Sequence, residues 1–344
     1  MSAEPEVAPV RAGEALDWPA LEARLRADLA DLPADPMSVL QFPRGSANLT
    51  YRLSFGDLHL VLRRPPFGKA APGAHDMGRE HRILSRIWRA YPRAPRAYLL
   101  CEDVSVIGAP FVVQEYRGGG EVIFDQLPPG MVGLPDLGLR LARAMADALA
   151  DMHTIDIAAA GLSDLGKPEG FVARQMSGWR DRWARAAPTP SIPAMDRVAD
   201  ALEASRPLSS ASALIHNDFK LNNCQFRPDD PDEVVTVFDW DMATLGDPLI
   251  DVGIVLNYWS SMSAAPGLEL PPKEVFAQMY AERAKLGVEA LRWYEAFACW
   301  RMAITVQQLC NRYRQGDSHD DRLAGLDARV PEFAERAGQV LQGG

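Results

Sequence analysis

Three oxygen-bearing side chains, Asp218, Asn223 and Asp239, follow short apolar stretches of the chain. The segment His216–Asn223 has the pattern H-x-D-x₄-N, and the apolar run Val234–Phe238 ends at Asp239. Carboxylate and amide oxygens are good Mg²⁺ ligands, and a carboxylate beside a hydroxyl can accept its proton. The set matches what phosphoryl transfer requires, so we expect Asp218 to be the base, with Asn223 and Asp239 holding Mg²⁺ against the phosphates of a nucleotide.

Short apolar runs on both sides of the motif predict strands that deliver these groups to one place. Asp241 would lie on the same side as Asp239 if the second strand continues, as an additional carboxylate. His216 and Asp251 are interpreted as anchors of the loop, and His153 as a structural residue at a helix end. The alternative is a solvated turn that is merely rich in Asn and Asp.

A Gly/Ser/Asn-rich turn lies near residue 45, between two predicted strands. Small residues let backbone N–H groups approach phosphate oxygens, and Ser46, Asn48 and Thr50 would add donors. A polar hairpin turn has the same composition, so this interpretation depends on the motif downstream.

A cation on the strand that follows is the expected phosphate ligand. Strand alternation directs Arg63 inward and Arg64 to the opposite face. Kinases usually have a lysine here, paired with a glutamate of the next helix, and Glu80 fits that partner. Arginine keeps the charge and adds bidentate phosphate geometry. An ordinary surface Arg–Glu pair is the alternative.

The segment Gln114–Tyr116 ends the last predicted strand before the glycines at 118–120. We expect the backbone at Gln114 and Tyr116 to hydrogen-bond an adenine. The glycine triplet tolerates hinge dihedrals and is the expected lobe boundary.

The predicted elements indicate an α+β fold. After a loose arm over residues 1–15, a helix is expected from Asp17, its N-cap, to Leu29. Period-two patterns predict strands over residues 37–42, 51–55, 58–63, 97–101 and 111–116, with a helix over 77–88. Apolar spacing predicts helices over about 133–152, 168–186, 193–204, 248–260, 272–285, 289–314 and 321–341. We therefore expect an N-terminal arm and helix (1–33), a small antiparallel β N-lobe with one helix (34–117) and a larger, mainly helical C-lobe (118–344).

Composition describes an ordinary globular protein. The chain has 344 residues, 47% hydrophobic and 24% charged, with a formal net charge of −10. This acidity argues against a nucleic-acid partner. No apolar segment reaches the roughly 20 residues that span a bilayer, and no basic, apolar leader is visible, so we expect no membrane partner and a cytoplasmic location. The four scattered cysteines are expected to be free thiols.

Together these motifs resemble the aminoglycoside phosphotransferase and choline kinase-like family, a branch of the protein-kinase-like fold. The resemblance rests on Leu214–Asp218 with Asn223, on Phe238–Asp241, and on Gly246-Asp247-Pro248 with Asp251. It implies a two-lobed kinase fold, ATP and Mg²⁺ as cofactors, and a small-molecule hydroxyl as acceptor.

Further segments look like one subgroup of that family. They include Ser46–Tyr51, Val61–Pro66 and Gly166–Phe171. The subgroup contains kinase-like domains joined to acyl-CoA dehydrogenases, which implies a hydroxyacyl-CoA or related hydroxy acid as acceptor and a functional link to such a dehydrogenase. The oligomeric state is left open.

Two rival functions remain open. A non-catalytic pseudokinase would explain arginine in place of lysine, but leaves the Asp/Asn/Asp set without a purpose. Phosphorylation of aminoglycosides would call for an acidic acceptor pocket. The arginines at 174, 180, 182 and 185, near Trp179 and Trp183, could instead contact an anionic CoA moiety, or form the polar face of an amphipathic helix.

Overall fold

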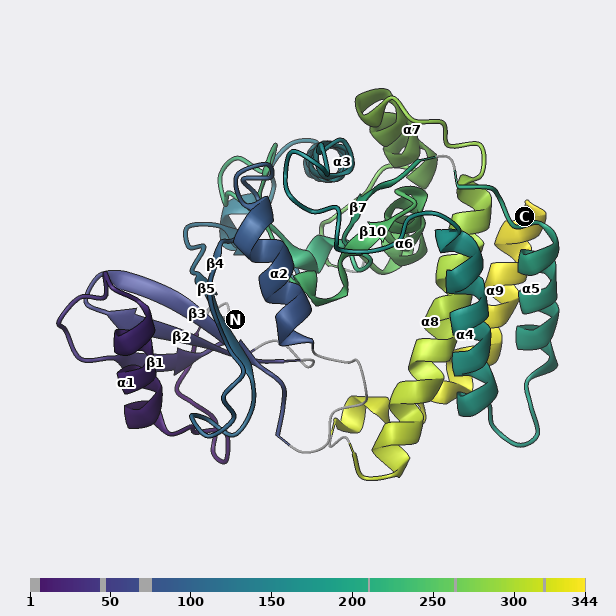
Figure 1. The fold of residues 1–344 in the computed structure, drawn as a ribbon. Coiled ribbons are helices and arrows are strands. Elements are labelled where there is room, and N and C mark those ends of the chain that lie inside the picture. Colours follow the sequence, from purple (N-terminus) through teal and green to yellow (C-terminus); the bar gives the residue numbers. More distant parts are fainter. Residues whose placement is uncertain are drawn as a thin grey trace.

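The computed structural model describes residues 7–43, 48–67, 76–209, 211–262, 265–317 and 320–343. It has two lobes, with a β-sheet on the left in Figure 1 and helices on the right. The predicted α+β class and the two-lobed, kinase-like arrangement are therefore confirmed.

The N-lobe is built on a five-stranded antiparallel sheet in the order β1-β2-β3-β5-β4. Its strands are β1 (Ser38–Gln41), β2 (Leu49–Phe55), β3 (Leu58–Arg64), β4 (Ala97–Cys101) and β5 (Phe111–Glu115). Alternation along β5 sends Phe111 and Val113 into the N-lobe core and Val112 into the core of the C-lobe. The sheet thus separates two hydrophobic cores.

Two helices complete the N-lobe. α1 (Trp18–Asp28) begins at Asp17, whose side chain accepts a hydrogen bond from the Ala20 amide at 3.0 Å, as predicted. The buried leucines of α1 join the N-lobe core. α2 (Met77–Ile87) instead places its buried apolar residues in the C-lobe core, so it connects the two lobes.

The expectation of a loose N-terminal arm is wrong for the part that the structure describes. Ala8 and Gln41 exchange two backbone hydrogen bonds of 2.8 Å, which adds a bridge at the edge of β1. The Tyr51 hydroxyl donates to the Glu14 carbonyl at 2.7 Å. Unpaired backbone groups at a sheet edge attract such pairing, which composition alone does not reveal.

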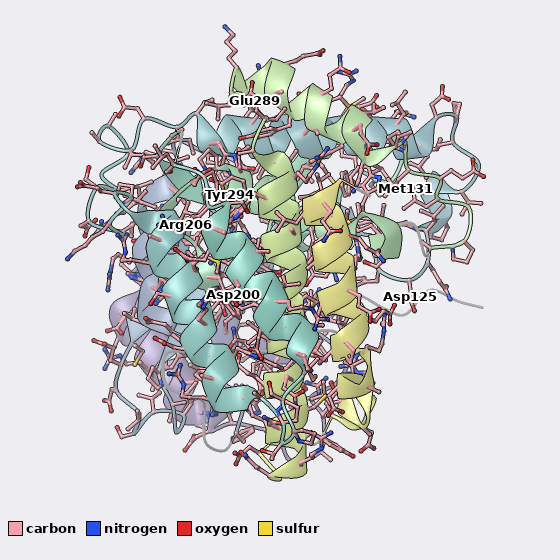
Figure 2. All side chains as sticks on the ribbon, turned by 90° about the vertical axis from the view of Figure 1, so that its right-hand side faces the viewer. Asp125, Met131, Asp200, Arg206, Glu289 and Tyr294 are labelled. Atoms are coloured by element: carbon pink, nitrogen blue, oxygen red, sulfur yellow. The ribbon has the colours of Figure 1, made fainter. Side chains whose placement is uncertain are left out.

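The C-lobe is mainly helical. Its helices are α3 (Leu137–His153), α4 (Phe171–Ala186), α5 (Pro193–Ala204), α6 (Leu249–Met262), α7 (Lys273–Ala284), α8 (Leu291–Arg314) and α9 (Val330–Gln342). The view in Figure 2 faces α5, which carries Asp200, together with α4 and the yellow α9; the long α8, which carries Tyr294, packs against all three.

Short strands hold the loops that carry the motif residues. β7 (Ala213–Ile215) pairs with β10 (Thr244–Gly246), and β8 (Cys224–Phe226) pairs with both β6 (Glu121–Val122) and β9 (Val234–Val237). The strands β7, β8 and β9 confirm the prediction, whereas β6 and β10 were not predicted.

The last predicted helix begins later than expected. Residues 321–329 contain two 3₁₀ turns, Asp321–Leu323 and Leu326–Arg329, and α9 starts only at Val330. Gly325, at φ 72°, breaks the helical path, and Pro331 favours a helix start because it needs no amide donor there.

Candidate active site

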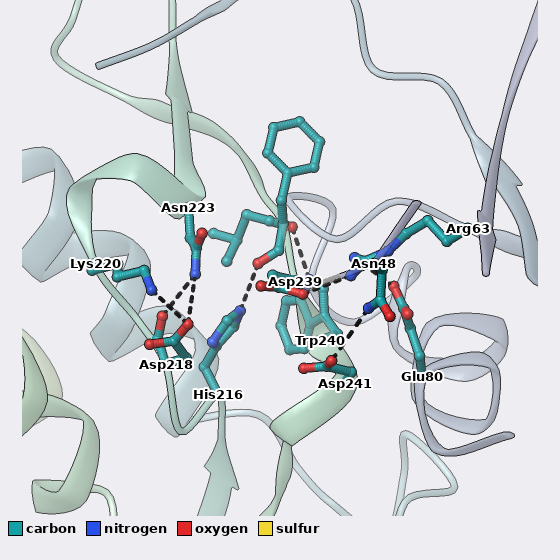
Figure 3. A network of polar contacts seen from close by, with 12 residues as sticks. Asn48, Arg63, Glu80, His216, Asp218, Lys220, Asn223, Asp239, Trp240 and Asp241 are labelled. Carbon is teal, nitrogen blue, oxygen red and sulfur yellow. Dashed lines mark hydrogen bonds and ion pairs between the residues drawn. The ribbon is translucent and has the colours of Figure 1, made fainter. Parts of the chain in front are cut away.

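The candidate catalytic loop follows β7. Lys220 Nζ lies 2.7 Å from Asp218 Oδ2, and Asn223 Nδ2 donates to the Asp218 carbonyl at 2.9 Å and to Asp218 Oδ2 at 3.3 Å (Figure 3). A 3₁₀ turn, Leu221–Asn223, returns the chain to β8. The three polar side chains are therefore fixed relative to one another by contacts within one short loop.

Asp251 anchors the candidate catalytic loop, as predicted. Its buried carboxylate accepts hydrogen bonds from the backbone amides of His216, at 2.7 Å, and Asn217, at 2.6 Å. It also lies 3.2 Å from the Nε2 atom of His153, whose structural role is thus confirmed. Asn217 has φ 67°, a left-handed conformation that such anchoring sustains.

His216 links the two motif segments. Its Nε2 atom lies 2.8 Å from the carbonyl oxygen of Phe238, the residue before Asp239. The ring is buried against Trp240 and Phe219. The predicted anchoring role is confirmed, and this contact fixes the position of Asp239 relative to the catalytic loop.

Asp239 occupies a left-handed turn at the end of β9, with φ 68° and ψ 62°. The condition under which strand alternation would place Asp241 is not met, because a 3₁₀ turn, Trp240–Met242, follows Asp239. Asp241 nevertheless faces the site, and Asn48 Nδ2 lies 3.4 Å from its Oδ2. The turn, rather than strand alternation, places both carboxylates on one side (Figure 3).

Arg63 connects the lobes at the site. Its guanidinium forms ion pairs with Glu80 Oε1 at 2.8 Å and with Asp239 Oδ1 at 2.7 Å. Arg64 points to the other face and donates to the Ile107 carbonyl at 3.0 Å, so the predicted choice between the two arginines is confirmed. The planar fork of arginine explains how one cation contacts two carboxylates.

The carboxylates around Arg63 have different pKa values. Burial works against the charge of Asp239, but the Arg63 guanidinium, together with His216 and Lys220, outweighs burial and lowers the pKa of Asp239. Burial raises the pKa of Glu80 to about 7, although Arg63 opposes the shift. Burial and then the Asp239 carboxylate raise the pKa of Asp241 to about 6. The carboxylates around Arg63 therefore carry more negative charge than Arg63 neutralises, and a bound cation would reduce the repulsion between them.

The donor set fits a magnesium ion. The amide nitrogen of Asn223 donates to Asp218, and no described residue donates to its Oδ1 oxygen. Asp239 contributes a carboxylate. The described residues contain no group of three or more His, Cys, Asp or Glu arranged as a metal cage. Mg²⁺ sites of phosphoryl-transfer proteins typically use one or two carboxylates, with phosphates and water completing the octahedron.

The residues predicted to contact the nucleotide lie in different surroundings. Asn48 faces Asp241, and Thr50 lies opposite Arg63 in the β2–β3 register. Ser46 lies outside the described residues. Gln114 is buried within β5, and its Oε1 atom accepts no hydrogen bond within the described chain.

The backbone after β5 differs from a simple hinge. The Glu115 amide donates to the Arg96 carbonyl at 2.8 Å, so that donor is used within the protein. The Tyr116 ring contacts His59 and Arg52. At Gly120 an added Cβ would lie 2.5 Å from Gln225 Cγ, so close packing requires glycine at that position of the triplet.

Lys220 is the site residue that sequence reasoning missed. It lies two positions after Asp218, and the signal that could have found it is a cation inside a motif otherwise built of acid and amide groups. Its ammonium contacts both the Asp218 carboxylate and the Tyr258 ring, whose centroid is 5.4 Å away.

The arginines of α4 mostly form a polar face. Arg180 pairs with Asp200 at 2.8 Å, and Arg174 donates to the carbonyls of Lys167 and Glu169. Trp179 and Trp183 are buried. The amphipathic-helix interpretation therefore accounts for Arg174 and Arg180.

A family model described as "Phosphotransferase enzyme family" matches residues 38–297, a range that contains every predicted site residue. The chain belongs to this phosphotransferase family. Among curated relatives, acyl-CoA dehydrogenase family member 10 of Mus musculus is 35% identical, over 91% of this chain and 30% of the relative. Family member 11 of Gallus gallus is 30% identical, over 98% and 45%. The chain thus spans less than half the length of these relatives.

Solved structures with the same fold are named as aminoglycoside phosphotransferases. A putative aminoglycoside phosphotransferase from Ralstonia eutropha JMP134 matches with a TM-score of 0.79 and 29% identity, covering 95% of this chain and 99% of the other. A thermostable mutant of the aminoglycoside phosphotransferase APH(4)-Ia, in a ternary complex with AMP-PNP and hygromycin B, matches with a TM-score of 0.61 and 15% identity, over 94% and 99%. No helix in the described part of this phosphotransferase is long and apolar enough to cross a membrane.

Proposed function

We propose that this phosphotransferase is an ATP- and Mg²⁺-dependent kinase that phosphorylates a hydroxyl of a small molecule. The observation that carries the proposal is the convergence of Asp218, Lys220 and Asn223 from one loop with the Arg63–Asp239 pair that bridges the lobes. Carboxylates with perturbed pKa values around a buried cation are typical of a functional site.

Asp218 is the proposed general base. As the acceptor oxygen forms its bond to the γ-phosphorus, the Asp218 carboxylate takes the hydroxyl proton, and the bond from phosphorus to the β-phosphate oxygen breaks to release ADP. Lys220 holds the Asp218 carboxylate in place and adds positive charge near the transferring group.

The remaining residues hold the nucleotide. Asn223 and Asp239 are the proposed Mg²⁺ ligands, and bound Mg²⁺ neutralises the β- and γ-phosphates. Arg63, oriented by Glu80, is the phosphate ligand. Asn48 and Thr50 are the proposed donors to the phosphates, and the backbone at Gln114 and Tyr116 would hydrogen-bond the adenine.

For the acceptor we favour a hydroxyacyl-CoA or a related hydroxy acid. The curated relatives named as acyl-CoA dehydrogenase family members support this choice. We also propose a functional link with an acyl-CoA dehydrogenase. An aminoglycoside acceptor is the alternative, favoured by the name of the structural relative.

The test is ADP release from Mg-ATP across hydroxyacyl-CoAs, free hydroxy acids, choline-like amines and aminoglycosides. We expect turnover with a CoA thioester or a hydroxy acid and none with aminoglycosides. Turnover with aminoglycosides alone would overturn the acceptor assignment. Mg²⁺-dependent ATP binding without transfer to any acceptor would favour the pseudokinase.

A further inference from the structure

The Arg301 side chain on α8 is buried and forms no direct ion pair with a described residue. Only 8% of the residue is exposed. Its guanidinium faces the rings of Trp179, at 4.9 Å, and Phe297, at 5.8 Å, and no described residue accepts a hydrogen bond from it or forms an ion pair with it. Buried arginines are normally paired, because an isolated buried charge is costly.

Other buried arginines of this chain do have polar partners. Arg63 has the carboxylates of Glu80 and Asp239, and Arg64 has two backbone carbonyl oxygens. Arg301 has aromatic neighbours instead, and they supply only part of what a guanidinium loses on leaving water. No carboxylate in the described ranges contacts the Arg301 guanidinium directly, so a bound ligand could supply the missing anion.

The position of Arg301 connects it to the candidate catalytic loop. Arg301 interacts electrostatically with Tyr258 on α6. Tyr258 contacts Lys220, which in turn contacts Asp218. Burial lowers the pKa of Arg301 to about 10, and the Asp218 carboxylate is the largest influence in the opposite direction. The guanidinium is therefore charged at neutral pH and near the proposed base.

We infer that Arg301 binds an oxyanion group of the acceptor, a carboxylate or a phosphate, while the acceptor hydroxyl lies against Asp218. This inference rests on the proposed function and narrows its substrate class. A bidentate guanidinium–oxyanion contact would orient the hydroxyl and would disfavour polycationic acceptors. Arg301 is thus a residue that determines specificity, not the base.

The experiment is calorimetric binding to the full chain with Mg-AMP-PNP present. The probes are short hydroxy acids, the neutral methyl ester of each acid, and glycerol phosphate, which separates a phosphate preference from a carboxylate preference. We expect an acid or the phosphate to bind at least about 30-fold more tightly than the esters, and Arg301→Met to remove that preference. Arg180→Met, which removes a guanidinium already paired with Asp200, is the matched control and should keep it.

Three results would overturn the inference. One is esters binding as tightly as both the acids and glycerol phosphate, and another is no anion binding to the wild type. The third is a preference for anions that survives in Arg301→Met. Thermal unfolding adds a second readout. Removal of an unpaired buried charge should leave the unfolding midpoint unchanged or raised, whereas a purely structural Arg301 would lower it. ADP release tests the proposed kinase activity separately. Anion binding without turnover would contradict the proposed function but not the assignment of Arg301 as an anion ligand.

Discussion

At the scale of single residues, the site depends on two carboxylates that are each paired with a cation. Lys220 keeps the Asp218 carboxylate at 2.7 Å, and Arg63 keeps Asp239 at 2.7 Å. Each acid that the proposed mechanism uses is therefore paired with a cation before any ligand binds. Such pairing holds the reacting groups in position, which reduces the reorganisation needed during catalysis.

Lys220→Met removes the ammonium and keeps most of the stem. We expect kcat to fall by about 100-fold, because a charge near the transferring group is lost, while the dissociation constant of the Mg-nucleotide changes little. Steady-state ADP release and nucleotide titration measure the two quantities. Lys285→Met, at an exposed position, is the matched control. A change confined to nucleotide affinity would show that Lys220 binds ATP and does not assist transfer.

Asp239→Asn removes the negative charge of a proposed Mg²⁺ ligand. We expect Mg²⁺-dependent binding of AMP-PNP to weaken at least about 10-fold, because an amide is a poorer ligand for a hard cation. Fluorescence titration with and without Mg²⁺ measures the effect. Asp232→Asn, which alters an exposed carboxylate paired with Arg140, is the control. Wild-type Mg²⁺ dependence in Asp239→Asn would remove Asp239 from the metal site.

At the scale of elements, close helix packing positions the loop anchors. An added Cβ at Gly253 of α6 would lie 2.6 Å from the backbone of Tyr294 in α8. α6 also carries Asp251, which holds the catalytic loop. The distance between these two helices therefore determines where the catalytic loop lies.

Gly253→Ala should destabilise the protein by about 2 kcal/mol, because the α6 and α8 backbones must separate. Gly178→Ala is a matched control in α4, where an added Cβ meets nothing within 4 Å. It should stabilise the protein by about 0.5–1 kcal/mol, since alanine favours the helix. Urea unfolding measures both. Equal stabilities of the two variants would contradict the close α6–α8 packing.

Much of the fold follows from local sequence signals. Alternation in β3 indicated which of Arg63 and Arg64 points inward, and Asp17 marked the start of α1. β10 was missed because its three residues become a strand only by pairing with β7, some 30 positions earlier. The left-handed turn at Asp239 was missed for a similar reason: the His216 contact that fixes it comes from a distant loop.

The candidate site was predictable to the same extent. The spacing of Asp218 and Asn223 predicted that both lie on one loop, as they do, and the end of a strand indicated Asp239. Their roles stay predictions. The neighbours of Arg301 could not be predicted, because α8 buries residues on all sides and its sequence shows no polar face that would contain Arg301. Only the packing of α4 against α8 places its guanidinium over Trp179.

At the scale of the whole molecule, the proposed nucleotide site is built from residues of both lobes, each of which has its own hydrophobic core. Arg63 and Glu80 come from the N-lobe, whereas Asp239 and Asn223 come from the C-lobe. A ligand that contacts both sides should stabilise the folded chain as one unit. Mg-AMP-PNP at about 100 times its dissociation constant should add about 2.7 kcal/mol to the free energy of unfolding.

Removal of Mg²⁺ should cancel that stabilisation. In excess EDTA we expect AMP-PNP to leave the unfolding midpoint at its ligand-free value, because Asp239 and the phosphates then repel each other. Differential scanning calorimetry with and without EDTA measures the shift. The same increase in both conditions would show that the nucleotide binds without a metal.

The most direct test compares Asp218→Asn with the wild type on an acceptor that supports ADP release. The substitution keeps the size of the side chain and removes its ability to accept the hydroxyl proton. We predict that turnover falls at least about 100-fold while the affinity for Mg-AMP-PNP stays within about threefold of the wild type. Wild-type turnover in Asp218→Asn would contradict the assignment of Asp218 as the base.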